Sequence, residues 1–380
     1  MKIAFDIQLL LKNEITGIGW CADNIVKNLP HIKGNEYQIN CFLPRNKGEL
    51  RNRVDKYSLF GYRVKTCSWF NNVLYQLLSN FLYLPYSLFF GDDQDITVFF
   101  NYLVPPGVKG KKIVFIHDMV YKAYPKTVRG RTKYMLNLSL KKSTKRANHI
   151  VTVSQFSKSE IIKYLKIPES KISVVYNGVD LSIYHPYYTE EDINRVLEYY
   201  KLPRQYLLYL GTLEPRKNIV RLVQAYAKLK KDGNEIPKLV LAGGKGWMYE
   251  NIFKTVETLN LENDVIFTGY VKQADAPILL RGAKVFLFPS IYEGFGMPPL
   301  EAMACGTPVL ASNTASLPEV VGDAGILVDP FSIESIQQGM KLLLENKMVR
   351  EELSKKGLER ARQFTWANSL QGLQKVFETL

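Results

Sequence analysis

Short apolar runs alternate with longer amphipathic stretches along almost the whole chain. The runs are rich in Val, Ile, Leu and Phe, and the stretches between them repeat apolar residues at helical spacing. Continuous apolar runs of this kind are typical of parallel strands that helices cover on both faces. The pattern therefore predicts an α/β fold built on parallel sheets.

The apolar runs form two series, which a polar, tyrosine-rich stretch separates. The first series consists of KIAFDI, YQINCFL, DITVFFN, KKIVFIHD, HIVTVS and KISVVYN, and the second of YLLYLGT, KLVLAGG, DVIFTGY, KVFLFPS, PVLAS and GILVD. A chain of 380 residues also exceeds the size of one ordinary core. We predict two Rossmann-like, doubly wound domains, 1–180 and 181–365, with a junction near Asn177–Pro186 and a central cleft between them.

Helices are expected between the strands of the first series. One is predicted near Gly19–Leu29, and a basic one near Thr132–Arg146. In the stretch SKSE, Ser157 and Glu160 match a capping box, in which the serine and the glutamate each bond a backbone N–H of the first turn. This pattern predicts that a third helix begins at Ser157.

The composition is that of a soluble globular protein, with 46% hydrophobic and 23% charged residues. The four cysteines are scattered, without the spacing of a zinc site or a disulfide framework, which fits a reducing cytoplasm. We expect no metal site, because three of the four histidines, His31, His149 and His185, have no second ligand nearby in the sequence. The N-terminal stretch MKIAFDIQLL is interpreted as a first strand rather than a signal peptide.

Positive charge is concentrated in the first half of the chain. Residues 1–180 hold 27 Lys and Arg against 13 Asp and Glu, a balance of +14, whereas residues 181–380 hold 23 of each. Within Lys109–Arg146 there are 12 basic residues and a single acid, Asp118. Such a field attracts anionic membranes, nucleic acid or phosphorylated substrates. A solvated basic face is the plainer interpretation.

The segment Cys67–Phe90 contains no charged residue. Its asparagines, glutamine, serines and Pro85 make it a poor membrane-spanning helix, which needs about 20 mainly apolar residues. One interpretation is a buried helix of the first domain. The other is an apolar surface that touches lipid or a lipid-borne acceptor.

Ligands of doubly wound sheets bind beyond the carboxyl ends of the strands, so the loops that follow strands are where chemistry is expected. The loops most marked by Gly, Lys and acidic residues are Thr16–Gly19, His117–Asp118, Gly211–Lys217, Gly243–Gly246 and Glu293–Gly296. They would converge on one cleft if the two domains face each other.

The stretch EGFGMPPLE joins the strand VFLFPS to a helix. Pro298 and Pro299 suit the first positions of a helix, where a missing N–H costs little. The helix N-terminus offers free amides and a positive dipole to an anion such as phosphate. Glu293 and Glu301 then place one carboxylate on each side of that anion site.

Two further loops carry groups suited to a phosphorylated ligand. In GTLEPRKN, Arg216 and Lys217 stand at a second helix N-terminus, where two cations together can neutralise a diphosphate. The alternative is an ordinary solvent-facing basic pair. His117 ends the strand VFIHD, where it either orients a substrate hydroxyl, transfers a proton or merely lines the site.

The stretch TGIGWCA formally matches a dinucleotide-binding fingerprint at Gly17, Gly19 and Ala22. The match is weak because about nine residues separate the first strand from Gly17, whereas the fingerprint needs a tight turn. A flexible glycine lip that closes on a ligand is the better interpretation.

Taken together, the chain resembles the retaining glycosyltransferases of family 4, which have the two-domain GT-B fold. The resemblance is strongest over Tyr206–Pro330, through YLLYLGTLEPRKN, LAGGKGW, VIFTGYV, FPSIYEGFGMPPLEAMACGTPVLASN and LPEVVGDAGILVDP. The glutamate pair with seven residues between them is its most specific element.

The resemblance implies roles for the loop EGFGMPPLE. Glu293 corresponds to the glutamate that lies against the hydroxyls and reacting carbon of the donor sugar, and Glu301 to the one that bonds the nucleotide ribose. Backbone amides of the intervening loop would hold sugar and phosphate oxygens; this loop consists of Gly294, Phe295, Gly296 and Met297.

It also implies roles for the other loops. Lys217 corresponds to the family's diphosphate-binding lysine, whereas Thr212 stands where the family has its partner arginine, so Arg216 would take over that charge. The remaining correspondences are His117 near donor sugar and acceptor, Gly17 and Gly19 as the lip near the diphosphate, and Tyr270 and Val271 at the base.

The motifs GTLEPRKN and LAGGKGW look most like the mannosyltransferase branch that builds surface polysaccharides. The resemblance therefore implies mannose transfer from GDP-mannose to a hydroxyl of a lipid-linked glycan acceptor. The enzyme would be cytoplasmic, peripheral to the inner face of the membrane, and would need no metal. The resemblance also implies that the first domain, 1–180, binds the acceptor and that the second, 181–365, binds the nucleotide-sugar donor. The C-terminal helix 366–380, with Trp366 as its anchor, would cross back to the first domain. Alternatives are a UDP-sugar donor, a nucleotide-sugar epimerase or hydrolase, and a basic nucleic-acid-binding protein.

Overall fold

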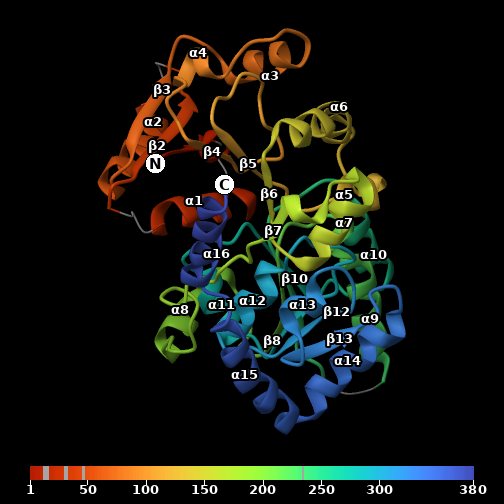
Figure 1. Ribbon diagram of the computed structural model, residues 1–380. Helices are drawn as coiled ribbons and strands as arrows, with labels where there is room; N and C mark the ends of the chain where they lie inside the picture. The colour runs from red at the N-terminus through yellow and green to blue at the C-terminus, as the bar shows by residue number, and fades with distance from the viewer. Residues whose placement is uncertain (12–16, 30–32, 45–47, 233–234) are drawn as a thin grey trace. The chain divides into compact units, whose positions relative to one another are not determined.

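The structure is a computed structural model that describes residues 1–11, 17–29, 33–44, 48–232 and 235–380. The chain divides into two compact units (Figure 1). Unit 1 comprises Met1–Asn177 together with Trp366–Leu380, and unit 2 comprises Gly178–Thr365. The division falls three residues before the predicted boundary at Asp180, and the C-terminal helix belongs to unit 1.

Unit 1 is built on a seven-stranded parallel sheet in the order β3-β2-β1-β4-β5-β6-β7. Its strands are β1 (Lys2–Asp6), β2 (Glu36–Phe42), β3 (Arg63–Cys67), β4 (Ile96–Phe99), β5 (Lys111–Phe115), β6 (His149–Thr152) and β7 (Ile172–Val174). The direction of the strand order reverses between β1 and β4, and this switch point is where ligands of such sheets bind. The strand β3 was not predicted, because RVKTC is short, carries charges and lies half-exposed at the sheet edge.

Helices cover both faces of this sheet. They are η1 (Gln8–Leu11), α1 (Gly17–Asn28), α2 (Gly48–Asp55), η2 (Lys56–Phe60), α3 (Asn72–Phe81), α4 (Ser87–Phe90), α5 (Val120–Ala123), η3 (Pro125–Thr127), α6 (Gly130–Arg146), α7 (Gln155–Leu165), η4 (Glu169–Lys171) and α16 (Trp366–Glu378).

The predicted cap at Ser157 is wrong. The helix α7 is capped by Ser154, which accepts the Ser157 N–H at 3.0 Å, while the Ser157 hydroxyl is drawn inward to the His117 carbonyl.

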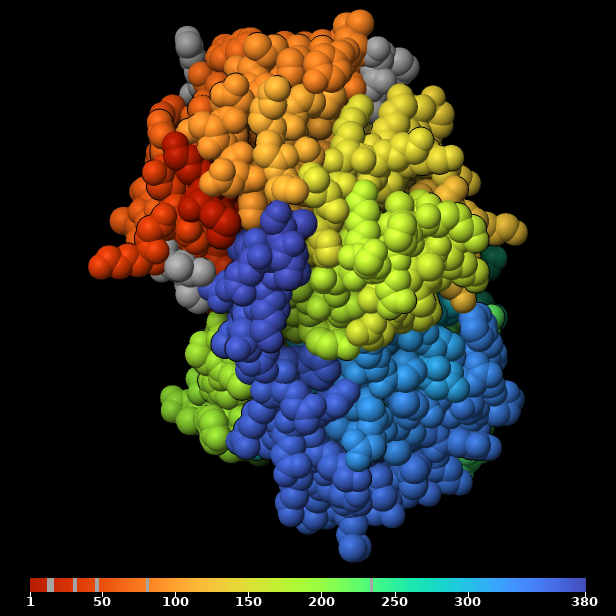
Figure 2. Space-filling model, in the orientation of Figure 1, coloured from red at the N-terminus to blue at the C-terminus, as the bar shows by residue number. Residues whose placement is uncertain are grey.

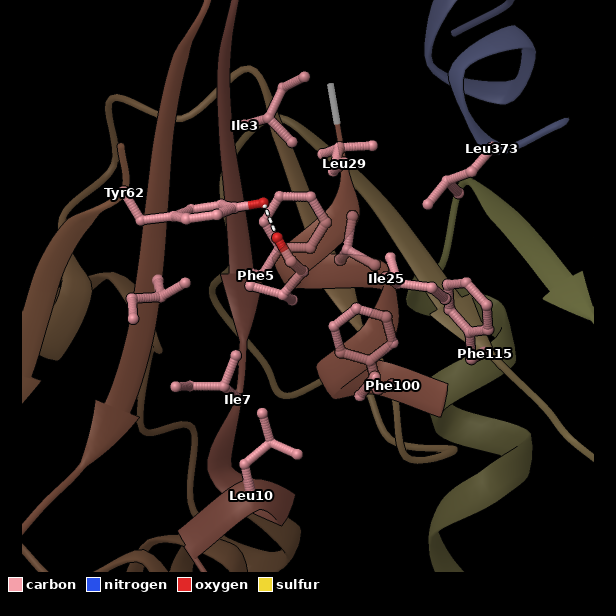
Figure 3. Close-up of a cluster of buried hydrophobic side chains, with 14 of the residues drawn as sticks. Ile3, Phe5, Ile7, Leu10, Ile25, Leu29, Tyr62, Phe100, Phe115 and Leu373 are labelled. Atoms are coloured by element: carbon pink, nitrogen blue, oxygen red, sulfur yellow. Dashed lines mark hydrogen bonds between the residues drawn. The ribbon is translucent and has the colours of Figure 1, made fainter. Parts of the chain in front are cut away.

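The core of unit 1 includes the C-terminal helix of the chain. Figure 3 shows Leu373 of α16 among Ile25, Phe100 and Phe115, which are all buried. Nearby, the Tyr62 hydroxyl donates a hydrogen bond of 2.7 Å to a backbone carbonyl of α1, so the phenol is buried with its polar atom satisfied. In Figure 1 α16 lies beside α1, and the two helices pack together on one face of the sheet.

Unit 2 is built on a six-stranded parallel sheet in the order β10-β9-β8-β11-β12-β13. Its strands are β8 (Tyr206–Leu210), β9 (Lys238–Ala242), β10 (Val265–Gly269), β11 (Val285–Phe288), β12 (Val309–Ser312) and β13 (Gly325–Val328). Its helices are α8 (Glu190–Tyr200), η5 (Pro215–Lys217), α9 (Ile219–Lys231), α10 (Glu250–Thr258), α11 (Ala276–Gly282), α12 (Met297–Ala304), α13 (Leu317–Val321), α14 (Ile333–Glu345) and α15 (Lys347–Ala361). Every strand predicted for the second series is present, and the switch point lies between β8 and β11.

The uncharged segment 67–90 is not the buried helix that one interpretation predicted. Tyr75, Phe89 and Phe90 are buried, but many of its apolar side chains lie on the surface of unit 1. We call these the apolar patch: Trp69, Val73, Leu74, Leu77, Leu82, Tyr83 and Leu88. In the part of the chain that the structure describes, no helix has the length and apolar character needed to cross a bilayer.

Replacement of Leu373 by Ala should destabilise unit 1, because it leaves a cavity in a core that the chain end completes. We expect a loss of about 2–5 kcal/mol in the free energy of unfolding. Urea unfolding followed by tryptophan fluorescence measures this, since three of the four tryptophans belong to unit 1. The exposed Gln371→Ala, in the same helix, is the matched control. An equal effect of the two changes would contradict the packing of α16.

Candidate active site

A cluster of charged side chains joins the loops that follow β8 and β11, at the switch point of unit 2. The Glu293 carboxylate accepts hydrogen bonds from the Lys217 ammonium at 2.7 Å and from the Ser290 hydroxyl at 2.6 Å. Its other oxygen lies 2.8 Å from the Arg216 guanidinium. That guanidinium also bonds Glu214 at 2.7 Å and the Tyr292 carbonyl at 2.6 Å.

This cluster is largely shielded from water. Lys217 and Glu293 are each only 8% exposed. Burial by itself would raise the pKa of Glu293, but Arg216, Lys217 and the hydrogen bond from Ser290 outweigh it and lower the pKa to about 2. Burial lowers the pKa of Lys217, and the charge of Glu293 opposes that shift. Glu293 is therefore ionised at neutral pH, and its charge is held in place.

The prediction that Arg216 and Lys217 stand ready as a diphosphate counterion needs a qualification. In the structure both cations are paired with carboxylates, Arg216 with Glu214 and Glu293, and Lys217 with Glu293. Two cations and two carboxylates make the cluster neutral as a whole. An anionic ligand at this point would share the cations with the glutamates, and backbone amides would supply the remaining donors.

Backbone contacts fix the loops after β8 and β11 relative to each other. The Arg216 carbonyl accepts the Ile291 N–H at 2.9 Å. The Asn218 amide donates to the carbonyls of Pro289 and Pro330, at 3.0 and 2.6 Å, and so ties the loops after β8, β11 and β13 together. Asn218 directly follows the basic pair, yet its role depends on loops 71 and 112 residues away.

The glycine loop leads into α12 as predicted, with Pro298 and Pro299 in its first turn. Gly296 has φ 122°, a conformation open to glycine, and a Cβ there would lie 2.8 Å from the Leu317 side chain. The Ser316 hydroxyl lies 2.9 and 2.6 Å from the carbonyls of Glu293 and Phe295. These contacts fix the path between the two glutamates.

Glu301 lies in α12, and its carboxyl group bonds the hydroxyl of Tyr184. Burial raises the pKa of Glu301 to about 7, and the bond from Tyr184 partly offsets that increase. The environments of the two glutamates thus differ sharply: Glu293 stays charged, whereas Glu301 titrates near neutrality. Tyr184 was not predicted, because nothing in its local sequence links it to a helix more than 100 residues later.

The other residues predicted to bind the donor lie at the carboxyl ends of neighbouring strands. Thr212 is exposed after β8, and Tyr270 is 72% exposed after β10, whereas Val271 is buried. The strand ends are closely packed, since a Cβ on Gly243 would lie 2.0 Å from the Gly211 carbonyl oxygen. Of the loop residues, Phe295 is buried, and Gly294 and Met297 are half-buried.

His117 lies in unit 1 and is almost fully buried. Its Nε2 is 2.9 Å from the Phe100 carbonyl, which only accepts, so Nε2 carries the proton and Nδ1 the lone pair. Burial lowers the pKa of His117 to about 4, despite the bond to Phe100. The imidazole is therefore neutral at pH 7 and suits a hydrogen-bonding role better than proton donation.

The predicted glycine lip is wrong as to local structure. The helix α1 begins at Gly17, so Gly17 and Gly19 lie in its first turn and not in a loop. Thr16, the other residue named in that loop, lies outside the described residues. Among the described side chains, no group of three His, Cys, Asp or Glu is placed to hold a metal ion.

Two family models match the chain, one described as Glycosyltransferase Family 4 over residues 15–183 and one as Glycosyl transferases group 1 over residues 194–360. O-antigen chain mannosyltransferase B of Escherichia coli is 40% identical over 270 residues, which are 70% of each protein. The chain belongs to glycosyltransferase family 4. The serotype-specific mannosyltransferase WbdA of Escherichia coli is 35% identical over 228 residues, and the chain spans only 28% of that protein.

Solved structures share the GT-B fold of this family 4 member. Alr3699/HepE of Anabaena, described as a complex with UDP and glucose, aligns over 100% of both chains with a TM-score of 0.73 and 19% identity. WaaG, described as a glycosyltransferase involved in lipopolysaccharide biosynthesis, aligns over 98% of this chain and 99% of its own with a TM-score of 0.68 and 16% identity. At these identities the likeness concerns the fold.

Replacement of Glu293 by Gln in this glycosyltransferase should lower the free energy of unfolding of unit 2 at pH 7 by about 3 kcal/mol. This is the free energy that corresponds to a pKa lowered from 4.5 to about 2. The stabilisation by a carboxylate with a lowered pKa is present above about pH 4.5 and is lost as the pH falls toward 2. The difference between variant and wild type should therefore shrink below pH 4.5.

Hydrogen exchange of the β8 and β11 amides in urea, between pH 7 and pH 3, measures this difference. The matched control is Glu262→Gln, at an exposed position of the same unit. A Glu293→Gln difference that does not change with pH would show that the cluster does not stabilise the ionised carboxylate.

Proposed function

We propose that this protein is a retaining mannosyltransferase that moves mannose from GDP-mannose to a hydroxyl of a glycan in surface-polysaccharide biosynthesis. The observation that carries the proposal is the ionised, buried Glu293 at the switch point of unit 2, followed at the start of α12 by Glu301. The choice of mannose rests on the 40%-identical relative, whose name is that of an O-antigen chain mannosyltransferase.

The site offers a suitable group for each part of a nucleotide diphosphate sugar. Glu293 accepts hydrogen bonds from the sugar hydroxyls, and Glu301 accepts them from the ribose. Lys217, Arg216 and the amides before α12 stabilise the charge that develops on the departing diphosphate.

Retention of configuration follows, in this proposal, from attack on the same face that the diphosphate leaves. The acceptor oxygen forms a bond to the anomeric carbon as the bond to the diphosphate breaks, and the departing phosphate takes the hydroxyl proton. Glu293 is unsuited to serve as the base, because a carboxylate with a pKa of about 2 holds a proton poorly at neutral pH. Its role is electrostatic and orienting.

The acceptor is proposed to be a lipid-linked glycan, reached at an anionic membrane surface. The apolar patch supports this, since Val73, Leu74 and Leu77 are each about half exposed on one face of α3. In Figure 2 the orange surface of residues 67–90 adjoins the yellow surface of α6, which exposes Lys141, Lys142 and Lys145. Apolar and basic groups side by side suit an anionic bilayer.

The donor is tested by calorimetry with GDP, UDP and ADP and with their mannose, glucose and N-acetylhexosamine derivatives. We expect selective binding of GDP and GDP-mannose, weakened about tenfold or more by Glu301→Ala through loss of the hydrogen bond between its carboxyl group and the ribose. The exposed Glu262→Ala, with no place in the site, is the control. Selective binding of a UDP-sugar would replace GDP-mannose as the donor. A folded sample that binds none of these nucleotides or nucleotide sugars would refute the transferase.

The membrane surface is tested by flotation with vesicles, with and without an anionic lipid. Leu77→Asn should weaken binding about tenfold or more, because an exposed leucine of the apolar patch no longer enters the interface. Lys141→Glu with Lys142→Glu should weaken binding only to anionic vesicles. Leu342→Asn, at an exposed leucine of unit 2, is the matched control. Wild-type protein that floats with neither vesicle would contradict the membrane surface.

A further inference from the structure

The segment 180–188, which leads into the first helix of unit 2, packs beside the end of α12. The Arg281 guanidinium of α11 donates to the Pro186 carbonyl at 2.9 Å. A Cβ on Gly306, two residues after α12, would lie 3.5 Å from the Pro186 side chain. The segment is therefore fixed against the helix that carries Glu301.

Hydrogen bonds within the segment set the position of Tyr184. Its N–H donates to the Asp180 carbonyl at 2.8 Å, and the Asp180 carboxylate accepts the Ser182 N–H at 2.9 Å. The Tyr188 hydroxyl donates to the Ile183 carbonyl at 2.7 Å and closes the segment on itself. The hydroxyl of Tyr184 takes no part in these bonds, so it is available for a role outside the segment.

That hydroxyl bonds the carboxyl group of Glu301. Burial and the charge of Glu301 raise the pKa of the Tyr184 phenol, so the phenol keeps its proton and donates the hydrogen bond to the carboxylate. A carboxylate has about four acceptor sites, so one bond leaves most of them for a ligand.

The two glutamates of the site differ in their partners. Glu293 meets three side-chain donors, whereas Tyr184 is the one side-chain donor to Glu301 in the part of the chain that the structure describes. A half-buried carboxylate with a single donor retains unsatisfied acceptor sites, which the hydroxyl groups of a ribose can fill.

We propose that Tyr184 is a positioning residue for the donor nucleotide, whose hydroxyl holds one oxygen of the Glu301 carboxylate and leaves the other facing the ribose. The inference rests on the proposed function, in which Glu301 binds the ribose. It adds a residue that acts on the nucleotide only through Glu301, from a segment that precedes the first strand of unit 2.

This arrangement makes nucleotide binding depend on pH. Burial raises the pKa of Glu301 to about 7, and the bond from Tyr184 lowers it. Ribose hydroxyls bond an ionised carboxylate more strongly than a neutral one, so affinity should rise as the pH passes through 7. Without the Tyr184 hydroxyl the pKa of Glu301 should be higher still, and most of the carboxyl would be protonated at pH 7.

Other titratable groups lie near Glu301. Burial raises the pKa of the Cys305 thiol and of the Tyr188 phenol, and Arg281 of α11 stays charged, so these three keep their charge state around neutral pH. His185 stacks on Tyr188 with ring centroids 4.4 Å apart, and histidine is the side chain that ordinarily titrates near neutrality. A test by pH therefore needs a His185 variant.

The test is calorimetry with GDP, UDP and ADP at pH 7 and pH 8.5, on wild type and Tyr184→Phe. For the nucleotide that binds, the variant should bind about fivefold more weakly at pH 7 and less than twofold more weakly at pH 8.5, as expected if the pKa of Glu301 rises by about one. Titration of the ligand itself cancels, because both proteins meet the same ligand.

Two control variants separate this effect from a loosened segment and from histidine titration. Tyr188→Phe removes a hydroxyl from the same segment that does not bond Glu301, and His185→Gln removes the neutral-range titration. Each should change the affinity by the same factor at both pH values. A His185→Gln effect that varies with pH as the Tyr184→Phe effect does would overturn the proposal.

NMR titration of carboxyl carbons in carbon-13-labelled protein, without nucleotide, keeps this inference separate from the proposed function. The Glu301 signal is assigned by its loss in Glu301→Gln, and its midpoint should be near pH 7 in wild type and higher in Tyr184→Phe. Equal midpoints, or an affinity ratio that does not change with pH, would overturn the role of Tyr184. A raised midpoint in a protein that binds none of the nucleotides would keep the pairing and refute the transferase.

Discussion

The buried ion cluster of unit 2 is the interaction on which the site depends. A carboxylate as enclosed as Glu293 would be strongly destabilising without partners, so Arg216 and Lys217 must approach it. The two cations come from the loop after β8 and the carboxylate from the loop after β11, and these strands are neighbours in the sheet. The electrostatic requirement therefore fixes two loops at once, at the switch point where a ligand would bind.

The consequences of that pairing reach α12. With Glu293 held, the chain must turn within three residues to start the helix, which Gly296 permits and the Ser316 hydroxyl supports. The turn sets the position of Glu301, whose carboxyl group meets Tyr184 in a buried setting. Two glutamates eight positions apart thus acquire opposite pKa shifts, because one has cations beside it and the other has only a phenol.

The two units repeat one strand order but carry different chemistry at their switch points. Unit 2 places two cations and two carboxylates there, whereas the cavity beyond the strand ends of unit 1 is lined by Asp6 and Arg146 among amide and aromatic side chains. A shared fold therefore leaves specificity to the side chains on the loops.

Local patterns determined much of this protein in advance: the strands of the second series, the helix start at Pro298 and Pro299, and the family through the spacing of Glu293 and Glu301. They did not reveal the edge strand β3 or the pairing of both cations with carboxylates, and they left open whether the segment 67–90 is buried or exposes an apolar surface. Hydrophobic periodicity, and the Pro and Gly residues that mark where helices begin and end, are properties of neighbouring residues, so the sequence alone predicts them. The strand order brings distant loops together, and it therefore determines which helix faces are covered and which charges meet. Only the tertiary structure decided that order.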